Sequence, residues 1–380
     1  MTTILTNAHI ILQSEIVEGS ITFDEAGITS VDQGRSSLPS AIDAGGDFVA
    51  PGLIEMHTDN LEKHFMPRPG VMWPNGLAAA LSHDAQMAAA GVTTVFDALC
   101  AGYERGHNAA RSEIFRKLFA AVEDGVNSGH FRIDHQLHLR CELSGADLLR
   151  TIEPFVDHPL VGLASLMDHT PGQRQWRDLA KMKTYTMGSA GLTEAEFETH
   201  VKERMTQGTS NATINWPVIV ELFRSRAIPL ATHDDTTIEH VEAGLASGAV
   251  ISEFPTTIEA ATAAKQRGLG TVAGAPNVVR GGSHSGGVSV TELAEHGVLD
   301  GLSSDYVPAS LLQAVQKLHA ESRIALPDVI GMVTWKIADM LGIEDRGRLR
   351  PGLRADVVQF RFVGVTPIVR GLWSRGRRVL

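Results

Sequence analysis

The chain has 380 residues but little cysteine and no long apolar segment. Its two cysteines, Cys100 and Cys141, are too few for a disulfide framework and are typical of a protein in a reducing compartment. No segment approaches the ~20 consecutive apolar residues that cross a bilayer. The first residues also lack the basic start and the apolar stretch of a secretory signal. We therefore expect a cytoplasmic protein without a membrane anchor.

An excess of positive charge is absent as well. The formal net charge is −11, whereas proteins that bind nucleic acids or anionic membranes generally present a basic face. The composition therefore disfavours both as partners. It does not disfavour an anionic small molecule, because a pocket can be basic on an acidic protein. We expect a small-molecule substrate, and the composition leaves a homo-oligomer open.

The order of apolar segments predicts an α/β protein. Short strand-like segments separated by turn residues fill residues 1–50, and further hairpin-like segments follow residue 346. Between these ends, apolar segments alternate with helical stretches, which is typical of a parallel sheet. The eight segments are 53–56, 92–98, 136–141, 161–167, 228–231, 250–251, 271–273 and 298–303.

This alternation predicts a (β/α)8 barrel of the TIM type over residues 51–345. Residues 1–50 and 346–380 are expected to meet in one small β-sandwich domain. A plain barrel needs roughly 250 residues, so the chain is long enough for both parts.

Two local patterns refine this prediction. Asn75 is a good helix N-cap and Gly91 a good helix end, so a helix is expected between them, directly before the second barrel strand. The pattern weakens over residues 182–215, where we expect a loop-rich insertion with helices and no added strand.

Side chains of the metal-binding type follow the apolar segments. Reactive groups in a (β/α)8 barrel lie at the C-terminal ends of its strands, and imidazoles and carboxylates are suitable ligands for zinc and similar ions. A single histidine there is more often structural, and an aspartate before a helix is usually an N-cap. The recurrence at five strand ends nevertheless favours a metal site. The candidates are His57, Asp59, Glu142, His169, His233 and Asp305.

The charge and the spacing of these candidates favour two ions in one site. The three carboxylates carry more negative charge than a single divalent ion balances. His57 and Asp59 are two positions apart, so on a strand both would point to the same side. Several other histidines look helical or surface-bound, and we expect no catalytic role for them. They are His83, His107, His200, His240, His296 and His319.

Four segments, in chain order, resemble the amidohydrolase superfamily. They are residues 51–59 (PGLIEMHTD), 89–94 (AAGVTT), 303–305 (SSD) and 352–358 (GLRADVV). The first strand of that superfamily usually carries a His-x-His pair, whereas the second position here is Asp59. This departure indicates a subfamily.

One subfamily, of phosphonate-degrading hydrolases, is similar in eight motifs spread over nearly the whole chain. The motifs are 57–63 (HTDNLEK), 67–69 (PRP), 138–142 (HLRCE), 166–174 (LMDHTPGQR), 252–257 (SEFPTT), 274–277 (GAPN), 280–286 (RGGSHSG) and 304–306 (SDY). The resemblance implies hydrolysis of α-D-ribose 1-methylphosphonate 5-triphosphate to the 5-phosphate and diphosphate. It also implies that the six candidates hold two metal ions, with zinc the usual ion. Asp305 matches the superfamily residue that touches a metal and carries the proton, and whether Glu142 bridges the two ions stays open.

A triphosphate also needs guanidinium and N–H groups that metal ions cannot replace. The main candidate is the glycine-rich turn after Arg280, where bare backbone could surround phosphate oxygens. Arg140 is another, since it shares a strand face with Glu142 and His138, and a buried arginine needs a partner. For Lys63 and Arg68, a solvated surface role is the alternative. The full set is Arg280, Gly281, Gly282, Ser283, His284, Arg140, Arg174, Lys63 and Arg68.

Two other functions stay open at this point. The first is the commoner amidohydrolase reaction, cleavage of a cyclic amide C–N bond, which Asp59 and the arginine-containing loops count against. The second is a non-catalytic barrel that acts as a scaffold in a phosphonate-degrading assembly. The loss of several ligands would indicate a scaffold, but all six candidates are present.

Overall fold

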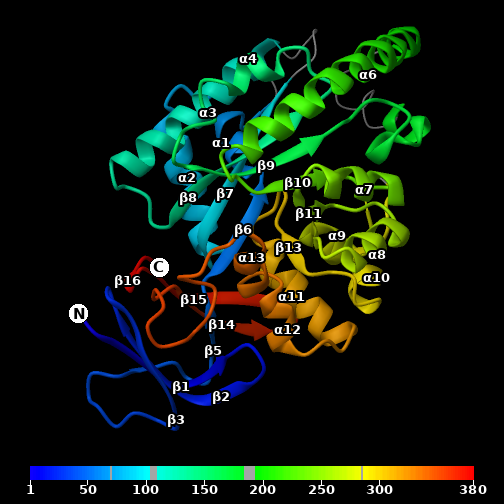
Figure 1. Cartoon of the computed structure of the whole chain (residues 1–380). Coiled ribbons are helices and arrows are strands. Elements are labelled where there is room, and N and C mark those ends of the chain that lie inside the picture. Colours follow the sequence, from blue (N-terminus) through cyan, green and yellow to red (C-terminus); the bar gives the residue numbers. More distant parts are fainter. Residues whose placement is uncertain (69–70, 103–108, 184–192, 284–285) are drawn as a thin grey trace.

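The computed structural model describes residues 1–68, 71–102, 109–183, 193–283 and 286–380. Eight parallel strands form one sheet in the order β13-β12-β11-β10-β9-β8-β7-β6, with helices around it (Figure 1). Each of the eight predicted apolar segments contributes to one of these strands. The strands are β6 (Leu53–Thr58), β7 (Val92–Ala101), β8 (Asp134–Glu142), β9 (Val161–Met167), β10 (Leu230–His233), β11 (Ala249–Glu253), β12 (Gly270–Gly274) and β13 (Gly301–Ser303).

The first and last of these strands meet at their C-terminal ends and nearly close the barrel. Thr58 and Asp305 form a parallel bridge. The Asp59 N–H donates to the Asp305 carbonyl (3.0 Å), and the Asp305 N–H donates to the His57 carbonyl (3.2 Å). At the other end, residues 332–333 accept backbone hydrogen bonds from both strands. The predicted (β/α)8 barrel is confirmed, and its closure brings three candidate ligands together.

Strands from both chain ends form a second, mixed sheet in the order β16-β15-β14-β5-β1-β2-β3, with β4 beside β1. The antiparallel pairing of β14 with β5 joins the C-terminal segment to the N-terminal one. The expected composite β-domain is therefore present, while domain boundaries near residues 50 and 346 stay a prediction. The strands are β1 (Thr3–Ile11), β2 (Ile16–Asp24), β3 (Gly27–Gln33), β4 (Ile42–Asp43), β5 (Phe48–Pro51), β14 (Val357–Val363), β15 (Thr366–Ser374) and β16 (Arg377–Arg378).

The helices follow the strands as expected, with one exception. Asn75 caps α2, accepting a hydrogen bond from the Ala78 N–H, and Gly91 follows the helix at φ +89°. The predicted loop-rich insertion is wrong where it overlaps α6, which is one helix of 31 residues that begins at a Thr193–Glu196 capping box. The helices are α1 (Asn60–Phe65), α2 (Gly76–Ala89), α3 (Ala109–Asn127), α4 (Leu148–Ile152), η1 (Arg174–Trp176), α6 (Glu194–Arg224), α7 (Ile238–Ala246), α8 (Ile258–Gln266), α9 (Ala275–Arg280), α10 (Val290–Glu295), α11 (Ser310–Glu321), α12 (Leu326–Gly331) and α13 (Trp335–Met340).

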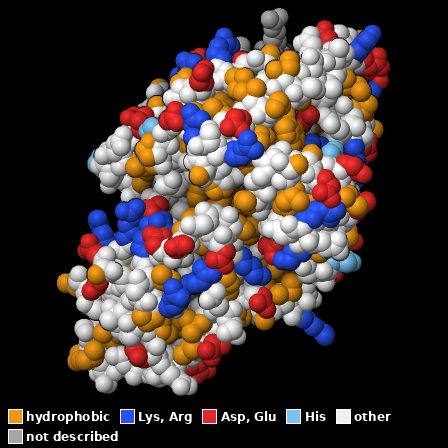
Figure 2. Space-filling model, viewed as in Figure 1, with side chains coloured by type: hydrophobic (Ala, Val, Ile, Leu, Met, Phe, Trp, Pro, Cys, Tyr) orange, Lys and Arg blue, Asp and Glu red, His pale blue; other side chains and the backbone are white. Residues whose placement is uncertain are grey.

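No helix within the described ranges combines the length and the apolar character needed to span a membrane. Acidic and basic side chains are mixed over most of the face shown in Figure 2, with a denser group of Lys and Arg near the C-terminus. In that part of the chain, Arg346 (2.6 Å) and Arg375 (2.7 Å) pair with Asp134 at the start of β8, and Arg354 binds the same carboxylate. These pairs tie the C-terminal segment to the barrel.

A second group of charged side chains is buried elsewhere in the barrel. Asp97 accepts hydrogen bonds from His83 Nε2 and His135 Nδ1, both at 2.7 Å, and the three side chains are fully buried. His135 Nε2 lies 3.5 Å from Asp84, whose carboxylate accepts from Arg132 (2.8 Å). Burial alone would lower the pKa of His135, but the Asp97 and Asp84 carboxylates raise it to about 9. His83 is helical, as expected, but it belongs to this buried network and not to the surface.

Asp97→Asn is expected to lower the free energy of unfolding by about 3–5 kcal/mol, because the buried His135 cation loses its carboxylate partner. Asp339→Asn is the matched control, since it removes a carboxylate from an exposed pair with Arg348 and should cost less than about 1 kcal/mol. Chemical denaturation followed by circular dichroism measures both. Equal losses for the two variants would contradict a structural role of the Asp97 network.

Candidate metal centre

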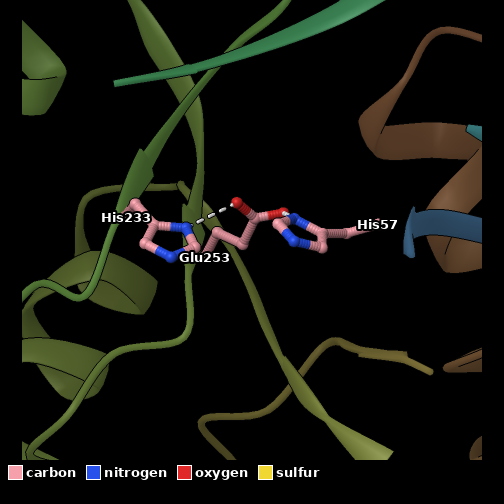
Figure 3. Close-up of side chains that lie close together, drawn as sticks. All are labelled: His57, His233 and Glu253. Atoms are coloured by element: carbon pink, nitrogen blue, oxygen red, sulfur yellow. Dashed lines mark hydrogen bonds and ion pairs between the residues drawn. The ribbon is translucent and has the colours of Figure 1, made fainter. Parts of the chain in front are cut away.

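A buried carboxylate at the end of β11 connects two of the candidate histidines. Glu253 accepts a hydrogen bond from His57 Nδ1 (2.7 Å) on β6 and another from His233 Nδ1 (2.9 Å) on β10 (Figure 3). The Glu253 side chain is fully buried, and the two histidine side chains are 1% and 6% exposed. Three residues from three strands therefore form one rigid group at the barrel mouth.

This arrangement fixes which nitrogen of each imidazole is available. A carboxylate only accepts, so both Nδ1 atoms carry the hydrogen and both Nε2 atoms keep a lone pair for a metal. Burial would raise the pKa of Glu253, but the fields of His57 and His138 and the two hydrogen bonds hold it well below its usual value. Glu253 is thus an ionised positioning group that sequence reasoning missed, although it stands in the SEFPTT motif.

Glu142 holds the third histidine in the same way. Its Oε2 atom accepts from His169 Nδ1 (2.5 Å), and its Oε1 atom accepts from the Ser144 hydroxyl (2.5 Å) and the His169 N–H (3.1 Å). Burial alone would raise the pKa of Glu142, but the charge and hydrogen bonds of His169 lower it to about 2. Both carboxylate oxygens are engaged, so the structure places Glu142 behind His169, and its role as a metal ligand stays a prediction.

Asp234 lies between the free nitrogens of two histidines and was also missed from the sequence. Its Oδ2 atom is 3.5 Å from His169 Nε2 and 3.6 Å from His233 Nε2. Asp234 adopts φ +55°, a left-handed backbone conformation that is uncommon for a residue other than glycine. The only sequence signal was its position directly after His233 at a strand end.

Asp59 and Asp305 form the remaining part of the centre. Asp59 occupies the N-cap position of α1 but makes no capping bond, and its Oδ1 atom is buried without a hydrogen-bond partner among the described residues. It lies outside β6, so the strand-alternation argument does not apply to it. Burial raises the pKa of Asp305, and the neighbouring Asp59 carboxylate raises it further. Two carboxylates that repel each other in this way favour a cation between them.

The donor set fits divalent metal ions. One group of ligand atoms within 4.8 Å of one another comes from His169, His233 and Asp234. The buried Asp59 Oδ1 and Asp234 Oδ2 atoms have no hydrogen-bond partner in the described part of the chain, as expected for oxygens that bind an ion. The centroids of the His169 and His233 rings are 5.7 Å apart, so two imidazoles from different strands meet at this site.

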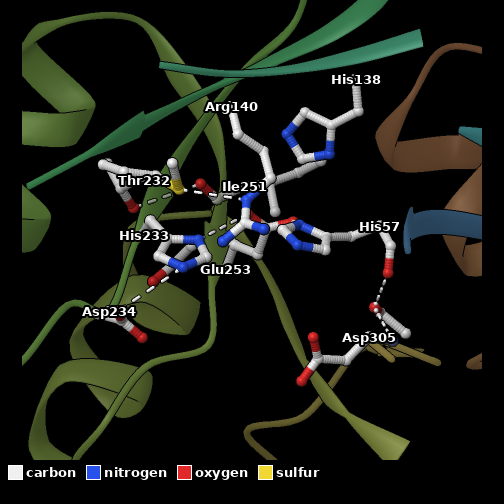
Figure 4. Close-up of polar contacts among 12 residues, drawn as sticks. His57, His138, Arg140, Thr232, His233, Asp234, Ile251, Glu253 and Asp305 are labelled. Atoms are coloured by element: carbon white, nitrogen blue, oxygen red, sulfur yellow. Dashed lines mark hydrogen bonds and ion pairs between the residues drawn. The ribbon is translucent and has the colours of Figure 1, made fainter. Parts of the chain in front are cut away.

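Two of the predicted substrate-binding arginines lie beside this centre. Arg140 reaches from β8 toward His57, His233 and Glu253, and its Nε atom lies 3.3 Å from the Met167 sulfur (Figure 4). Arg174 is 5% exposed, and its Nη1 atom donates to the His233 carbonyl (2.7 Å) and to Asp235 Oδ1 (2.9 Å). A guanidinium therefore approaches the centre from each of two sides.

The N–H groups of the glycine-rich turn after α9 were predicted to bind phosphate, but they donate to a backbone carbonyl of the helix instead. The Gly281 and Gly282 N–H groups both donate to the Asn277 carbonyl at 3.0 Å, and Gly281 is left-handed at φ +80°. They end α9, so these N–H groups are not available to wrap a phosphate. Arg280 contacts the Tyr306 hydroxyl (3.5 Å) instead.

The structure shows contacts or exposure for three more of the predicted substrate-binding residues. Lys63 binds the Tyr306 carbonyl and lies 4.9 Å above the centre of the Tyr306 ring. Arg68 is exposed and pairs through its backbone with Val71, in agreement with its surface alternative. Ser283 is half-buried, and His284 lies outside the described residues.

The overall fold is shared with solved structures. A structure described as an amidohydrolase is 15% identical with a TM-score of 0.65 and aligns over 100% of this chain and 99% of its own. The 5-methylcytosine deaminase of Klebsiella pneumoniae is 13% identical with a TM-score of 0.66, over 100% and 98% of the two chains. No family model matches the chain. These likenesses show an amidohydrolase-type barrel fold, and the described residues at its strand ends include groups that could hold a metal ion.

One relative narrows this class. The α-D-ribose 1-methylphosphonate 5-triphosphate diphosphatase of Escherichia coli K12 is 42% identical over 378 residues, which cover 99% of this chain and 100% of the relative. The chain belongs to the family of this diphosphatase. The resemblance stated from the eight motifs is confirmed.

Glu253→Gln tests the positioning role of Glu253. The Gln oxygen accepts from one imidazole only, and its amide group forces the other histidine to present Nδ1 as an acceptor and to carry its hydrogen on Nε2. We expect metal affinity to fall by about 10–100-fold, as for other groups that orient a metal-binding histidine. Competition with a chelator measures this, with the exposed Glu259→Gln on α8 as control. Full metal affinity in Glu253→Gln would contradict the role.

Proposed function

We propose that the chain hydrolyses α-D-ribose 1-methylphosphonate 5-triphosphate to the 5-phosphate and diphosphate. The observation that carries this proposal is the 42% identity, over the full length of both chains, with a diphosphatase named for that substrate. The histidine and carboxylate groups at the barrel mouth support it, because such a donor set suits metal-assisted hydrolysis.

We also propose that two divalent ions, zinc by the usage of the superfamily, bind at the barrel mouth. His169, His233 and Asp234 would hold one ion. His57, Asp59 and Asp305 would hold the other. Bound ions of this kind lower the pKa of water and neutralise charge on a phosphate oxygen. Glu142 and Glu253 would orient the imidazoles from behind, and a bridging role of Glu142 is not needed.

The reaction is a displacement at the phosphorus nearest the ribose. A water oxygen forms a bond to that phosphorus while the bond to the bridging oxygen breaks, and diphosphate leaves with the electron pair. Asp305 would accept the proton of the water, since its carboxylate lies at the barrel mouth with the proposed metal ligands. Arg140 would stabilise the developing negative charge, since its guanidinium lies beside the same imidazoles.

Further proposals concern the remaining substrate contacts, the location in the cell and the domain boundaries. We propose that the substrate's other anionic groups contact Arg174 on one side of the centre and Arg280 and Lys63 on the other. A cytoplasmic location and domain boundaries near residues 50 and 346 are proposed on the sequence alone, which leaves a homo-oligomer open. Cyclic-amide hydrolysis and a scaffold role are less well supported than this proposal, because the relative that aligns over its full length is named a diphosphatase.

Phosphorus NMR of the products tests the function directly. The protein loaded with zinc should convert the triphosphate into diphosphate and α-D-ribose 1-methylphosphonate 5-phosphate, and removal of the metal with a chelator should abolish this. Re-addition of zinc should restore turnover. A protein that opens a cyclic amide and leaves the triphosphate intact would instead carry out the commoner amidohydrolase reaction.

Asp305→Asn tests the proton acceptor. The amide is nearly isosteric but cannot take up the proton, so turnover should fall by about 10²–10⁴-fold while the thermal midpoint stays close to that of the wild type. Metal content is measured in parallel, because Asp305 is also a proposed ligand. Wild-type turnover at full metal content would remove Asp305 from the mechanism.

A further inference from the structure

A cavity of about 160 Å³ opens between the segments that follow β9, β11 and α9. It is polar and rich in cations. Its lining comes from residues 174–181, from Thr256 and from Gly286 and Gly287. Since a water molecule takes up about 30 Å³ of the liquid, this space exceeds the needs of a single small ion.

The cavity wall is rigidly connected to the metal centre. Arg174, which lines the cavity, donates to the backbone carbonyl of His233 (2.7 Å) and to Asp235 (2.9 Å). Thr256, on another side, donates its N–H to the Asp235 carbonyl (2.8 Å) and accepts from the Val288 N–H (2.9 Å). The cavity is therefore linked through Arg174 to the backbone of His233, whose imidazole is a proposed metal ligand.

The cavity presents more positive charge than its own carboxylates balance. Arg177 forms no ion pair with the described residues, and Lys181 lies 3.9 Å from Asp178, at the limit of a contact. The Oδ1 atom of Asp178 already accepts from the Ala180 N–H (3.0 Å) and the Lys181 N–H (3.2 Å). Two exposed cations thus face one acidic group that is partly used by the backbone.

The two glycines add N–H donors and allow a close approach. A Cβ atom at Gly286 would lie 1.9 Å from Lys181 Nζ, so only glycine lets the ammonium group come this near to the backbone. Gly286 is left-handed at φ +80°. The N–H groups of Gly286 and Gly287 donate to no acceptor in the part of the chain that the structure describes. Successive free N–H groups beside cations are a common anion-binding arrangement.

The turn after Arg280 offers no such arrangement. The Gly281 and Gly282 N–H groups end α9, and carbonyl groups at the end of a helix disfavour an anion. Arg280 and Lys63 both contact Tyr306. The described part of the chain therefore has two cationic regions, and of these two the cavity combines several cations with N–H groups that donate to no described acceptor.

We propose that this cavity binds the two outer phosphates of the triphosphate, the part that leaves as diphosphate, and that the residues around Tyr306 contact the methylphosphonate end. This inference rests on the proposed function and specifies how the substrate is oriented. Arg177, Lys181 and the Gly286–Gly287 N–H groups would be the contacts that sequence reasoning did not include.

The test is the affinity of the metal-loaded, full-length protein for inorganic diphosphate, measured by isothermal titration calorimetry. Arg177→Ala/Lys181→Ala should weaken diphosphate binding by at least about 10-fold, since charge-assisted hydrogen bonds to an anion are lost. Arg224→Ala/Lys317→Ala removes the same charge from helix positions outside the cavity, one exposed and one half-buried, and should have no effect. Metal content is measured before and after each titration, because diphosphate also chelates metal ions.

Arg280→Ala is the decisive comparison. It should leave diphosphate affinity unchanged while it raises KM for the triphosphate substrate by about 10-fold or more. The inference is overturned if Arg177→Ala/Lys181→Ala binds diphosphate like the wild type, or if Arg280→Ala weakens diphosphate binding instead. A wild-type protein that fails to hydrolyse the triphosphate overturns the proposed function, while the diphosphate titrations still decide whether the cavity is an anion site.

Discussion

The carboxylate of Glu253, buried between His57 and His233, is the constraint on which the centre depends. Its two partners stand on the first and the fifth strand of the barrel, so one side chain connects opposite walls. A buried carboxylate is costly unless hydrogen bonds or cations compensate it. Both imidazoles must therefore turn their Nδ1–H groups toward it, and their Nε2 atoms are left facing the barrel mouth.

A buried carboxylate that accepts from a histidine Nδ1–H group also occurs at a second position around the centre. Glu142 fixes His169 from behind, and Asp234 lies in front of the Nε2 atoms of His169 and His233. The Asp59 Oδ1 and Asp234 Oδ2 atoms accept no hydrogen bond from the described residues. In contrast, both carboxylate oxygens of Glu253 and of Glu142, behind the imidazoles, accept hydrogen bonds. Such a division suits metal binding, because the outer shell fixes the ligand geometry before any ion arrives.

Barrel closure and the small β-domain have separate effects on this centre. The bridge between Thr58 and Asp305 joins the two ends of the barrel and brings the carboxylates of Asp59 and Asp305 together. Strands from both chain ends form the composite sheet. Arginines of the C-terminal segment pair with Asp134 at the start of β8, whereas Glu142 stands at the end of the same strand. The chemistry thus stays at the strand ends, while chain-end pairing stabilises the scaffold.

The sequence by itself determined the eight strands, their order and the type of side chain at their ends, because alternation of apolar and polar residues is a local property. It also indicated α2 through Asn75 and Gly91. Only the tertiary structure decided that Glu253 and Asp234 belong to the centre, since their partners lie on other strands. It also decided that the N–H groups of Gly281 end a helix, while those of Gly286 face a cationic cavity. A glycine-rich motif is consistent with either use, and the choice depends on which acceptors the fold brings within hydrogen-bonding distance.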